Sequence, residues 1–297
     1  MTAHDSAIFT RSIAVGGTAF AALGVLCFSF TFPATSWALD GFGPWTITGL
    51  RGVLAAALAG VCLVVRRVPL PTGSDWPGLL AVAGGCVVGF PLLSTLALRT
   101  SSTAHSAVVI GMLPLATAAL SALRTGARAP RMFWWAALAG AVVVLAFTLQ
   151  QSAGRPSLAD GYLFAALLAC AAGYAEGGRL AQRMPGWQVV AWGVLAALPA
   201  TALTCVLALP AEPVHLTPHS MVGLGYLAAV SQFGGFVAWY GGMASIGVLR
   251  ASQLQLAQPL LTLCWAVLVL GERLPAAVPV TALAVVACIA VTQRVRG

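Results

Sequence analysis

Charged residues are scarce in this sequence, and lysine is absent from it. Only 7% of the 297 residues are charged, and all 15 basic residues are arginines. An ordinary soluble domain is about 25% charged and about 45–50% apolar, whereas 60% of these residues are hydrophobic. The composition therefore excludes a soluble globular enzyme and a disordered chain. The arginines are scattered, without the basic cluster that a phosphate backbone needs, so we expect no nucleic-acid partner.

The sequence also lacks the motifs of catalysis and of cofactor binding. Without lysine it has no phosphate-binding Gly-Lys loop, which excludes ATP-driven transport by this chain alone. It contains no Gly-x-Ser-x-Gly or His-Glu-x-x-His motif, and its seven acids lie far apart along the chain. Its seven cysteines lie in apolar runs without C-x-x-C spacing, as small buried hydrophobic residues do. We therefore expect no enzyme activity, no cofactor, no disulfide framework and no metal site.

Long apolar runs are what the sequence does contain. A membrane-spanning helix needs about 20 mostly apolar residues. Cutting the chain at clusters of charge, proline and glycine leaves ten runs of that length, and they are continuously apolar, which favours helices over alternating strands. We predict an all-α integral membrane protein with ten transmembrane helices. The predicted spans are 13–33, 46–65, 76–97, 103–122, 132–150, 158–180, 187–209, 220–243, 250–270 and 276–293.

The distribution of arginine predicts the orientation in the membrane. Ten spans put both termini on one side, and that side carries eleven arginines. The other side keeps four, namely Arg51, Arg99, Arg155 and Arg273. Because cytoplasmic loops carry the excess of basic residues, both termini are predicted to be cytoplasmic. The expected location is a bacterial-type inner (plasma) membrane, with the lipid bilayer as the chain's surroundings.

The chain contains an internal repeat. A shift of 145 residues aligns Pro114 with Pro259 and Gly89 with Gly234. Spans one to five thus match spans six to ten, and we place the two repeats at 1–150 and 151–297. Since five is odd, the second repeat enters the membrane from the opposite side. Inverted repeats of this kind are typical of alternating-access carriers, whose binding site lies near the midplane between the halves.

One segment of the chain resembles a known family. Residues 252–261 read SQLQLAQPLL, and the run Gly271-Glu272-Arg273 follows. Together they resemble the ninth-helix signature of EamA-type members of the drug/metabolite transporter superfamily. The first repeat has Gly126-Ala127-Arg128 at the corresponding place, so it lacks the glutamate.

The resemblance implies a fold and a class of function. The fold is two inverted five-helix repeats, with spans one to four and six to nine around a central cavity and spans five and ten at the periphery. The activity is export of small metabolites, and amino-acid exporters form a well-populated branch of the family.

Polar residues in the ninth and eighth spans are candidates for binding substrate. Gln255, Gln258 and Thr262 share one helix face. Pro259 removes a backbone donor and so frees the carbonyl of Gln255. Neutral amides at a broken helix could bind a zwitterion, or they could bond to neighbouring helices. In the eighth span, Gln232 and Trp239, with Tyr240 beside them, predict a pocket wall or an interfacial belt.

The other candidates lie elsewhere in the helices. His105 near the outer end could line the cavity and sense pH or simply be solvated, and Ser94 is a weaker lining residue. Glu176 with Arg179 forms either an ion pair at the cytoplasmic mouth or a proton-coupling site. We expect the gating or hinge positions at Pro33, Pro114, Pro259 and Gly173.

The sequence as a whole predicts a secondary transporter, an exporter or facilitator of small metabolites, with amino acids or similar amphiphiles as the leading substrates. No acid is expected at the midplane, which favours facilitated diffusion. The alternatives are a proton-coupled multidrug exporter that uses Glu176, a channel, or a membrane-embedded lipid-modifying enzyme. The substrate and the oligomeric state, a monomer or a weak homodimer, stay open.

Overall fold

The computed structural model describes residues 3–125, 131–151, 157–246, 251 and 254–294. These residues form helices and short connections, and within those ranges no β-strand occurs beyond one isolated bridge between Phe42 and Val214. Among the described residues, seven helices are long and apolar enough to cross a membrane, and three shorter apolar helices accompany them. The predicted all-α membrane fold is thus confirmed.

The first half of the chain forms five helical spans. Its helices are α1 (Ala3–Ser29) with α2 (Thr31–Leu39), α3 (Pro44–Val65), α4 (Trp76–Val82) with η1 (Ala83–Gly89) and α5 (Phe90–Leu98), α6 (Thr103–Ile110) with α7 (Leu113–Thr125), and α8 (Arg131–Gln151).

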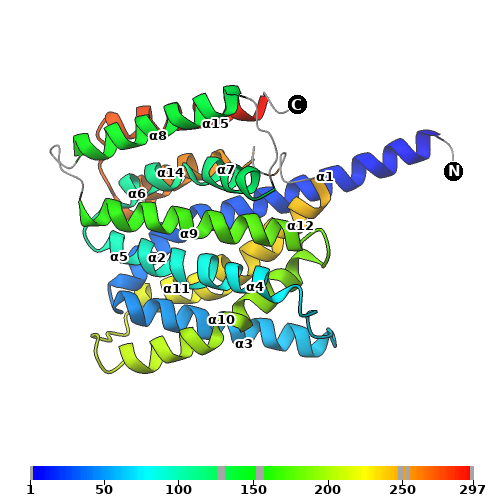
Figure 1. The fold of residues 1–297 in the computed structure, drawn as a ribbon. Coiled ribbons are helices and arrows are strands. Elements are labelled where there is room, and N and C mark those ends of the chain that lie inside the picture. The colour runs from blue at the N-terminus through cyan, green and yellow to red at the C-terminus, as the bar shows by residue number, and fades with distance from the viewer. Residues whose placement is uncertain (1–2, 126–130, 152–156, 247–250, 252–253, 295–297) are drawn as a thin grey trace.

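The second half forms the other five. Its helices are α9 (Leu158–Leu180), α10 (Gly186–Ala208), α11 (Pro218–Gly225) with η2 (Tyr226–Gly234) and α12 (Gly235–Ile246), α14 (Ala257–Leu270), and α15 (Ala277–Arg294). The beginning of α1 and the end of α15 lie at the same end of the bundle, at the right of Figure 1. We call this the terminal end and the opposite one, where α3, α6 and α9 begin, the distal end.

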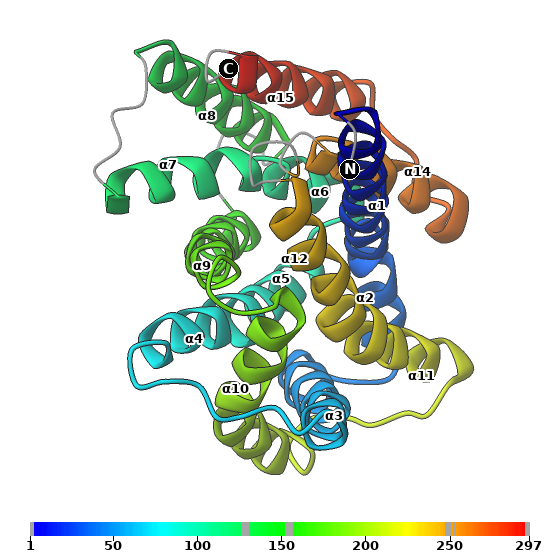
Figure 2. The same ribbon diagram turned by 90° about the vertical axis from the view of Figure 1, so that its right-hand side faces the viewer.

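The helices of the two halves pack against each other in matching pairs. Helix α3 packs on α10, the second span of one half on the second of the other, and α8 packs on α15 at one edge of the bundle (Figure 2). Helix α1 packs on α12, and the corresponding contact of α9 is with η1 and α5. First spans therefore meet third spans of the other half in both directions, which is the pairing that a pseudo-two-fold axis between inverted repeats produces.

Glycine lets these pairs approach closely. A Cβ added at Gly24 of α1 would lie 2.9 Å from the backbone nitrogen of Trp239 in α12. One added at Gly49 of α3 would lie 2.7 Å from the backbone nitrogen of Cys205 in α10. Backbones in such contact leave no room for a side chain, and in lipid this close packing drives helix association because burial of apolar surface does not.

Two pairs of spans, the third with the eighth and the fourth with the ninth, are interrupted near the middle at positions that follow the repeat. The π-helical segments η1 and η2 end at Gly89 and Gly234, which the shift of 145 residues aligns. The fourth span is interrupted between Ile110 and Leu113, and in the ninth a turn at Leu256 precedes α14. Irregular backbone at membrane depth is tolerated only where protein or a cavity surrounds it, so these interruptions mark the centre of the bundle.

The first span differs from its predicted extent. The sequence analysis ended it at Pro33, whereas helix continues to Leu39 after a break at Phe30, whose φ and ψ are −89° and 0°. Pro33 lies in the first turn of α2, where a proline's missing N–H leaves no helical bond unmade. The prediction that Pro33 ends this span is therefore wrong, and the discontinuity lies three residues earlier.

Candidate functional site

A narrow cavity lies where the interrupted helices meet. Its volume is about 30 Å³, roughly the room of two water molecules. A metabolite can enter only if these walls separate, so this conformation is nearly closed around its centre. The lining residues are Phe28, Thr31, Phe32, Arg51, Cys86, Phe90, Ala107, Ile110, Gly111, Leu113, Pro114, Cys170, Tyr174, Ser231, Phe236, Gln255, Gln258, Pro259 and Thr262.

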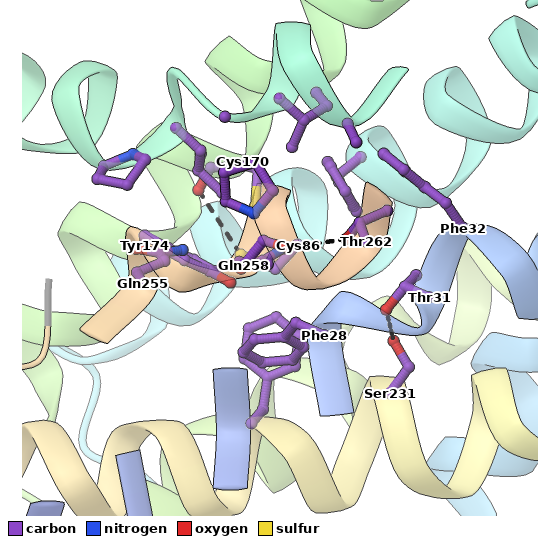
Figure 3. A pocket seen from close by; sticks show the side chains of 18 of the residues that line it. Phe28, Thr31, Phe32, Cys86, Cys170, Tyr174, Ser231, Gln255, Gln258 and Thr262 are labelled. Carbon is purple, nitrogen blue, oxygen red and sulfur yellow. Dashed lines mark hydrogen bonds between the residues drawn. The ribbon is translucent and has the colours of Figure 1, made fainter. Parts of the chain in front are cut away.

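The start of α14 supplies the amide groups of the cavity. Gln255 is 3% exposed, and its Nε2 has no hydrogen-bond partner within the described ranges. Oε1 of Gln258 likewise has no hydrogen-bond partner among the described residues. Figure 3 shows both side chains on one wall of the cavity, with the ring of Phe28 across from them. Buried polar atoms are normally paired, so two open amides on one wall offer a donor and an acceptor to a ligand.

Thr262, the third predicted residue of this face, is held by the fold. Its hydroxyl lies 2.8 Å from the carbonyl oxygen of Ser29 and 3.0 Å from that of Gln258. The Trp265 indole N–H donates to the Ser29 hydroxyl at 3.0 Å. These bonds attach α14 to the end of α1 next to its break at Phe30, so Thr262 satisfies a carbonyl that the break exposes.

Arg51 is a charged lining residue that the sequence analysis missed. It was counted with the cations of the outer side, but the structure places it in α3 with 3% of its surface exposed. Its Nη2 donates to the Ser231 hydroxyl at 3.2 Å, and that hydroxyl lies 2.9 Å from the Thr31 hydroxyl. Its Nε has no hydrogen-bond partner among the residues described. Among the described residues, none of the ion pairs includes Arg51.

Two glutamates at the distal end cap helices of the other half. Glu272 accepts the backbone N–H groups of Thr103 and Ala104 at 2.8 and 3.0 Å. Glu212 accepts those of Trp45 and Thr46 at 3.3 and 2.8 Å. The first four N–H groups of a helix lack partners within it, and the helix dipole favours a negative charge there. Each carboxylate therefore fastens the second half of the chain to the first.

His105 also joins the halves at the distal end. Its Nε2 lies 2.7 Å from Oδ1 of Asp160 at the start of α9, and its ring stacks on Phe147 at a centroid distance of 5.2 Å. Asp160 in turn accepts the backbone N–H of Ser157 in a capping box. His105 lies outside the cavity lining, so the structure corrects its predicted position.

Glu176 lies in α9 toward the terminal end. Its Oε2 is 3.0 Å from Nε of Arg179, and its Oε1 pairs with Arg124 of α7. The ion pair with Arg179 was expected, whereas the one with Arg124 was not. The carboxylate borders a separate open pocket of about 350 Å³ beside Leu120 and Ala172, outside the central cavity.

Several other predicted residues lie behind the cavity wall. Trp239 and Tyr240 are 2% and 0% exposed, and the Trp239 ring packs edge-on against Phe28 at 6.4 Å. Gln232 donates from Nε2 to the Cys86 carbonyl at 3.4 Å. Ser94 donates to the Phe90 carbonyl of its own helix at 2.6 Å. Their expected position in the lining is therefore wrong in this conformation, because each side chain fills the space between helices.

Apart from Pro33, which lies in the first turn of α2, the predicted hinges divide into two groups. Pro114 and Pro259 line the cavity in the first turns of α7 and α14, beside the interruptions of the fourth and ninth spans. Gly173 lies within the continuous helix α9, and a Cβ there would be 3.2 Å from the Cys86 backbone nitrogen. A close approach to η1 explains this glycine better than a hinge does.

Comparison with known proteins places the chain among transporters. The model of the EamA-like transporter family matches it twice, over residues 15–149 and 157–293. The uncharacterized transporter YdeK of Bacillus subtilis (strain 168) is 39% identical over 272 residues, which cover 92% of this chain and 95% of that protein.

Two further matches agree with that result. The uncharacterized transporter YcbK of the same organism is 28% identical over 275 residues, covering 88% of this chain and 87% of that protein. A solved crystal structure with 24% identity superposes at a TM-score of 0.65 over 93% of this chain and 97% of that one, which supports the fold.

Proposed function

Because the chain belongs to the EamA-like transporter family, we propose that it is a secondary carrier that exports small metabolites, amino acids first among them, by alternating access. Its relatives YdeK and YcbK bear the name of transporters. The expectation that it is no enzyme fits that kinship. The substrate class and the direction of transport are our own inference.

The observation that carries the proposal is the place of the cavity. Interrupted spans of both halves meet there, and the unpaired amides of Gln255 and Gln258 face it. Carriers built from inverted repeats bind substrate near the midplane, at discontinuous helices between the halves. Aromatic walls with a few convergent polar groups are typical of small-molecule sites.

The proposed movement is a rocking of the two halves. The distal ends of the halves are joined here by Glu212 and Glu272, each bound to the N-terminus of a helix from the other half. Release of these caps would let the distal ends separate while the interruptions beside Pro114 and Pro259 take up the bend. We propose a bacterial-type inner membrane with cytoplasmic termini, so that the distal end faces outward.

The charges of the cavity favour facilitated diffusion over proton coupling. Every lining residue lies in the described part of the chain, and none of them is an acid. Glu176, which a proton-coupled multidrug exporter would use, is engaged by Arg124 and Arg179 outside the cavity.

Counterflow of labelled amino acids in liposomes tests the proposal. The purified protein is reconstituted, and uptake is measured against an unlabelled internal pool with and without a pH gradient. We expect saturable exchange that needs no gradient. Absence of exchange across the twenty amino acids would refute the substrate class, and concentrative uptake driven by pH would refute facilitated diffusion.

A further inference from the structure

We propose that Arg51 is the anchor for a single negative charge on the substrate, so that the carrier selects small monocarboxylates with an apolar body. The inference rests on the proposed function, because it describes the substrate of the same cavity. It concerns a residue that the sequence analysis had assigned to the outer surface.

Arg51 carries a buried charge that no described acid balances. The side chain is 3% exposed, and its one hydrogen bond within the described ranges is donated to the Ser231 hydroxyl, a neutral group. Guanidinium groups stay protonated in proteins, so the charge persists inside the bundle. A buried charge is costly unless it is paired and fully hydrogen-bonded. Arg51 therefore favours any state in which an anion reaches it.

None of the residues that line the cavity can supply that anion. Glu212 and Glu272 are bound to helix N-termini, Asp160 to His105 and Ser157, and Glu176 to two arginines. The cavity lining contains no carboxylate. Arginine carries five N–H donors in a planar fork that matches a carboxylate, and the Nε of Arg51 has no hydrogen-bond partner among the described residues. The missing counter-ion must come from the substrate.

The aromatic walls of the cavity suit the rest of the ligand. Phe28 and Phe236 meet edge to face at 4.9 Å, and Phe32 and Phe90 stack at 6.3 Å. These rings line the same cavity as Arg51 and form apolar walls for a hydrocarbon or aromatic body. The open amide of Gln258 can accept a hydrogen bond from an ammonium group. One cation in the lining balances one negative charge, which favours a monocarboxylate over a dianionic phosphate.

A set of matched ligands tests this assignment on the purified full-length protein in detergent. The probes are L-phenylalanine, phenylalaninamide, which lacks the carboxylate, and 3-phenylpropanoate, which lacks the ammonium group. Inorganic phosphate is the dianion. Binding is measured by the ligand-induced shift in melting temperature and by isothermal titration. The variants are R51Q and R51K, with R66Q as the control, because Arg66 ends the same helix on the exposed surface.

The wild-type protein should bind both carboxylates at least about tenfold more tightly than the amide, since a hydrogen bond to a charged group contributes that much. R51Q should remove the preference, R51K should retain part of it, and R66Q should leave it unchanged. Without ligand, R51Q should melt no lower than wild type, because the substitution removes an unpaired buried charge.

Other outcomes would overturn the inference. Equal binding of phenylalanine and its amide, tighter binding of phosphate, or no binding of any probe by the wild-type protein each does so. A carboxylate preference that survives in R51Q, together with a lower melting temperature, would assign Arg51 a structural role only. Amino-acid counterflow that is unchanged in R51Q would refute the role of Arg51 but leave the proposed function standing. Carboxylate binding that depends on Arg51, without amino-acid exchange, would keep Arg51 as the anchor and refute amino acids as substrates.

Discussion

Removal of the Glu272 carboxylate should shift the carrier toward a conformation open at the distal end. In Glu272→Ala the N–H groups of Thr103 and Ala104, now bonded at 2.8 and 3.0 Å, lose their acceptor. Loss of an N-terminal cap costs about 0.5–2 kcal/mol. Water replaces the acceptor once the end opens, so this cost falls mainly on the closed state. The open-to-closed ratio should rise by roughly 2- to 30-fold, since about 1.4 kcal/mol corresponds to a factor of ten.

Two native cysteines report the change. Cys86 and Cys170 are 1% and 2% exposed and line the cavity, so a membrane-impermeant maleimide can reach them from outside only when the distal end opens. The labelling rate of each is measured in intact cells by mass spectrometry. The matched control is Asp75→Asn, because that acid bonds to Thr72 of its own loop and leaves the distal caps intact.

The labelling rates of the two variants decide between a link that holds the distal end shut and a cap that acts equally in both conformations. We expect faster labelling of Cys86 and Cys170 in Glu272→Ala and an unchanged rate in Asp75→Asn. Equal rates in a Glu272→Ala protein that melts at a lower temperature would show that the cap stabilises both conformations alike. That result would refute its role as a link between the halves.

Three further predictions follow from the packing and the cavity. Gly49→Leu should abolish folding, because its Cβ would lie 2.7 Å from a backbone nitrogen and overpacking alone costs about 1–3 kcal/mol. Gly161→Ala, whose Cβ would enter open space, should fold normally, and the size-exclusion profiles of the two variants should differ accordingly. Gln255→Leu should raise the melting temperature of the ligand-free protein, because it removes an unpaired buried amide, and should weaken counterflow. Glu176→Gln should keep counterflow in liposomes, and a pH gradient should drive accumulation in neither protein; accumulation by wild type alone would make Glu176 the coupling group.

The helical spans could be predicted closely from the sequence. The expected span 158–180 coincides with α9 (Leu158–Leu180), and the others differ by a few residues at most ends. The reason is physical, because the bilayer fixes the length of an apolar run and charges or prolines mark its ends. The place of the break at Phe30 escaped prediction, although Pro33 marks it: a proline there leaves the carbonyl of Ser29, four residues earlier, without a helical N–H. The sequence could not show that Thr262 and Trp265, of a helix far away in the sequence, bond to Ser29 instead.

The candidate site was predicted only in part. Gln255 and Gln258 were found because amides stand out in an apolar helix, and both line the cavity. Arg51 was missed although it lies inside the predicted span 46–65, because every arginine was assigned to one side of the membrane. The rule that ionisable residues within a span mark functional sites applies to it directly. Trp239 was placed wrongly because periodicity gives the face of a helix but not which neighbour covers that face.

The two halves share a fold but are fastened differently at the two ends, and this difference sets the balance between conformations. Inverted repeats of identical sequence would make the two open states equal in energy, because exchanging the conformations of the halves interconverts them. Here the distal end is tied by Glu212 and Glu272. A shift of 145 residues puts Arg67 and Ala127 at the corresponding places in the first half, and Ala127, like its neighbours Gly126 and Arg128, lies outside the described residues.

Among the described residues, the terminal end has the pair of Glu176 with Arg124, whose arginine is 67% exposed and whose glutamate is 4% exposed, and a contact of the exposed Arg66 guanidinium with the Trp187 ring at 5.5 Å. An exposed arginine exchanges such contacts for water at little cost, whereas loss of a helix cap costs about 0.5–2 kcal/mol. The terminal end should therefore open more readily than the distal end. If the termini are cytoplasmic, a carrier without substrate then rests with its cavity accessible from the cytoplasm, which is the state an exporter needs in order to load.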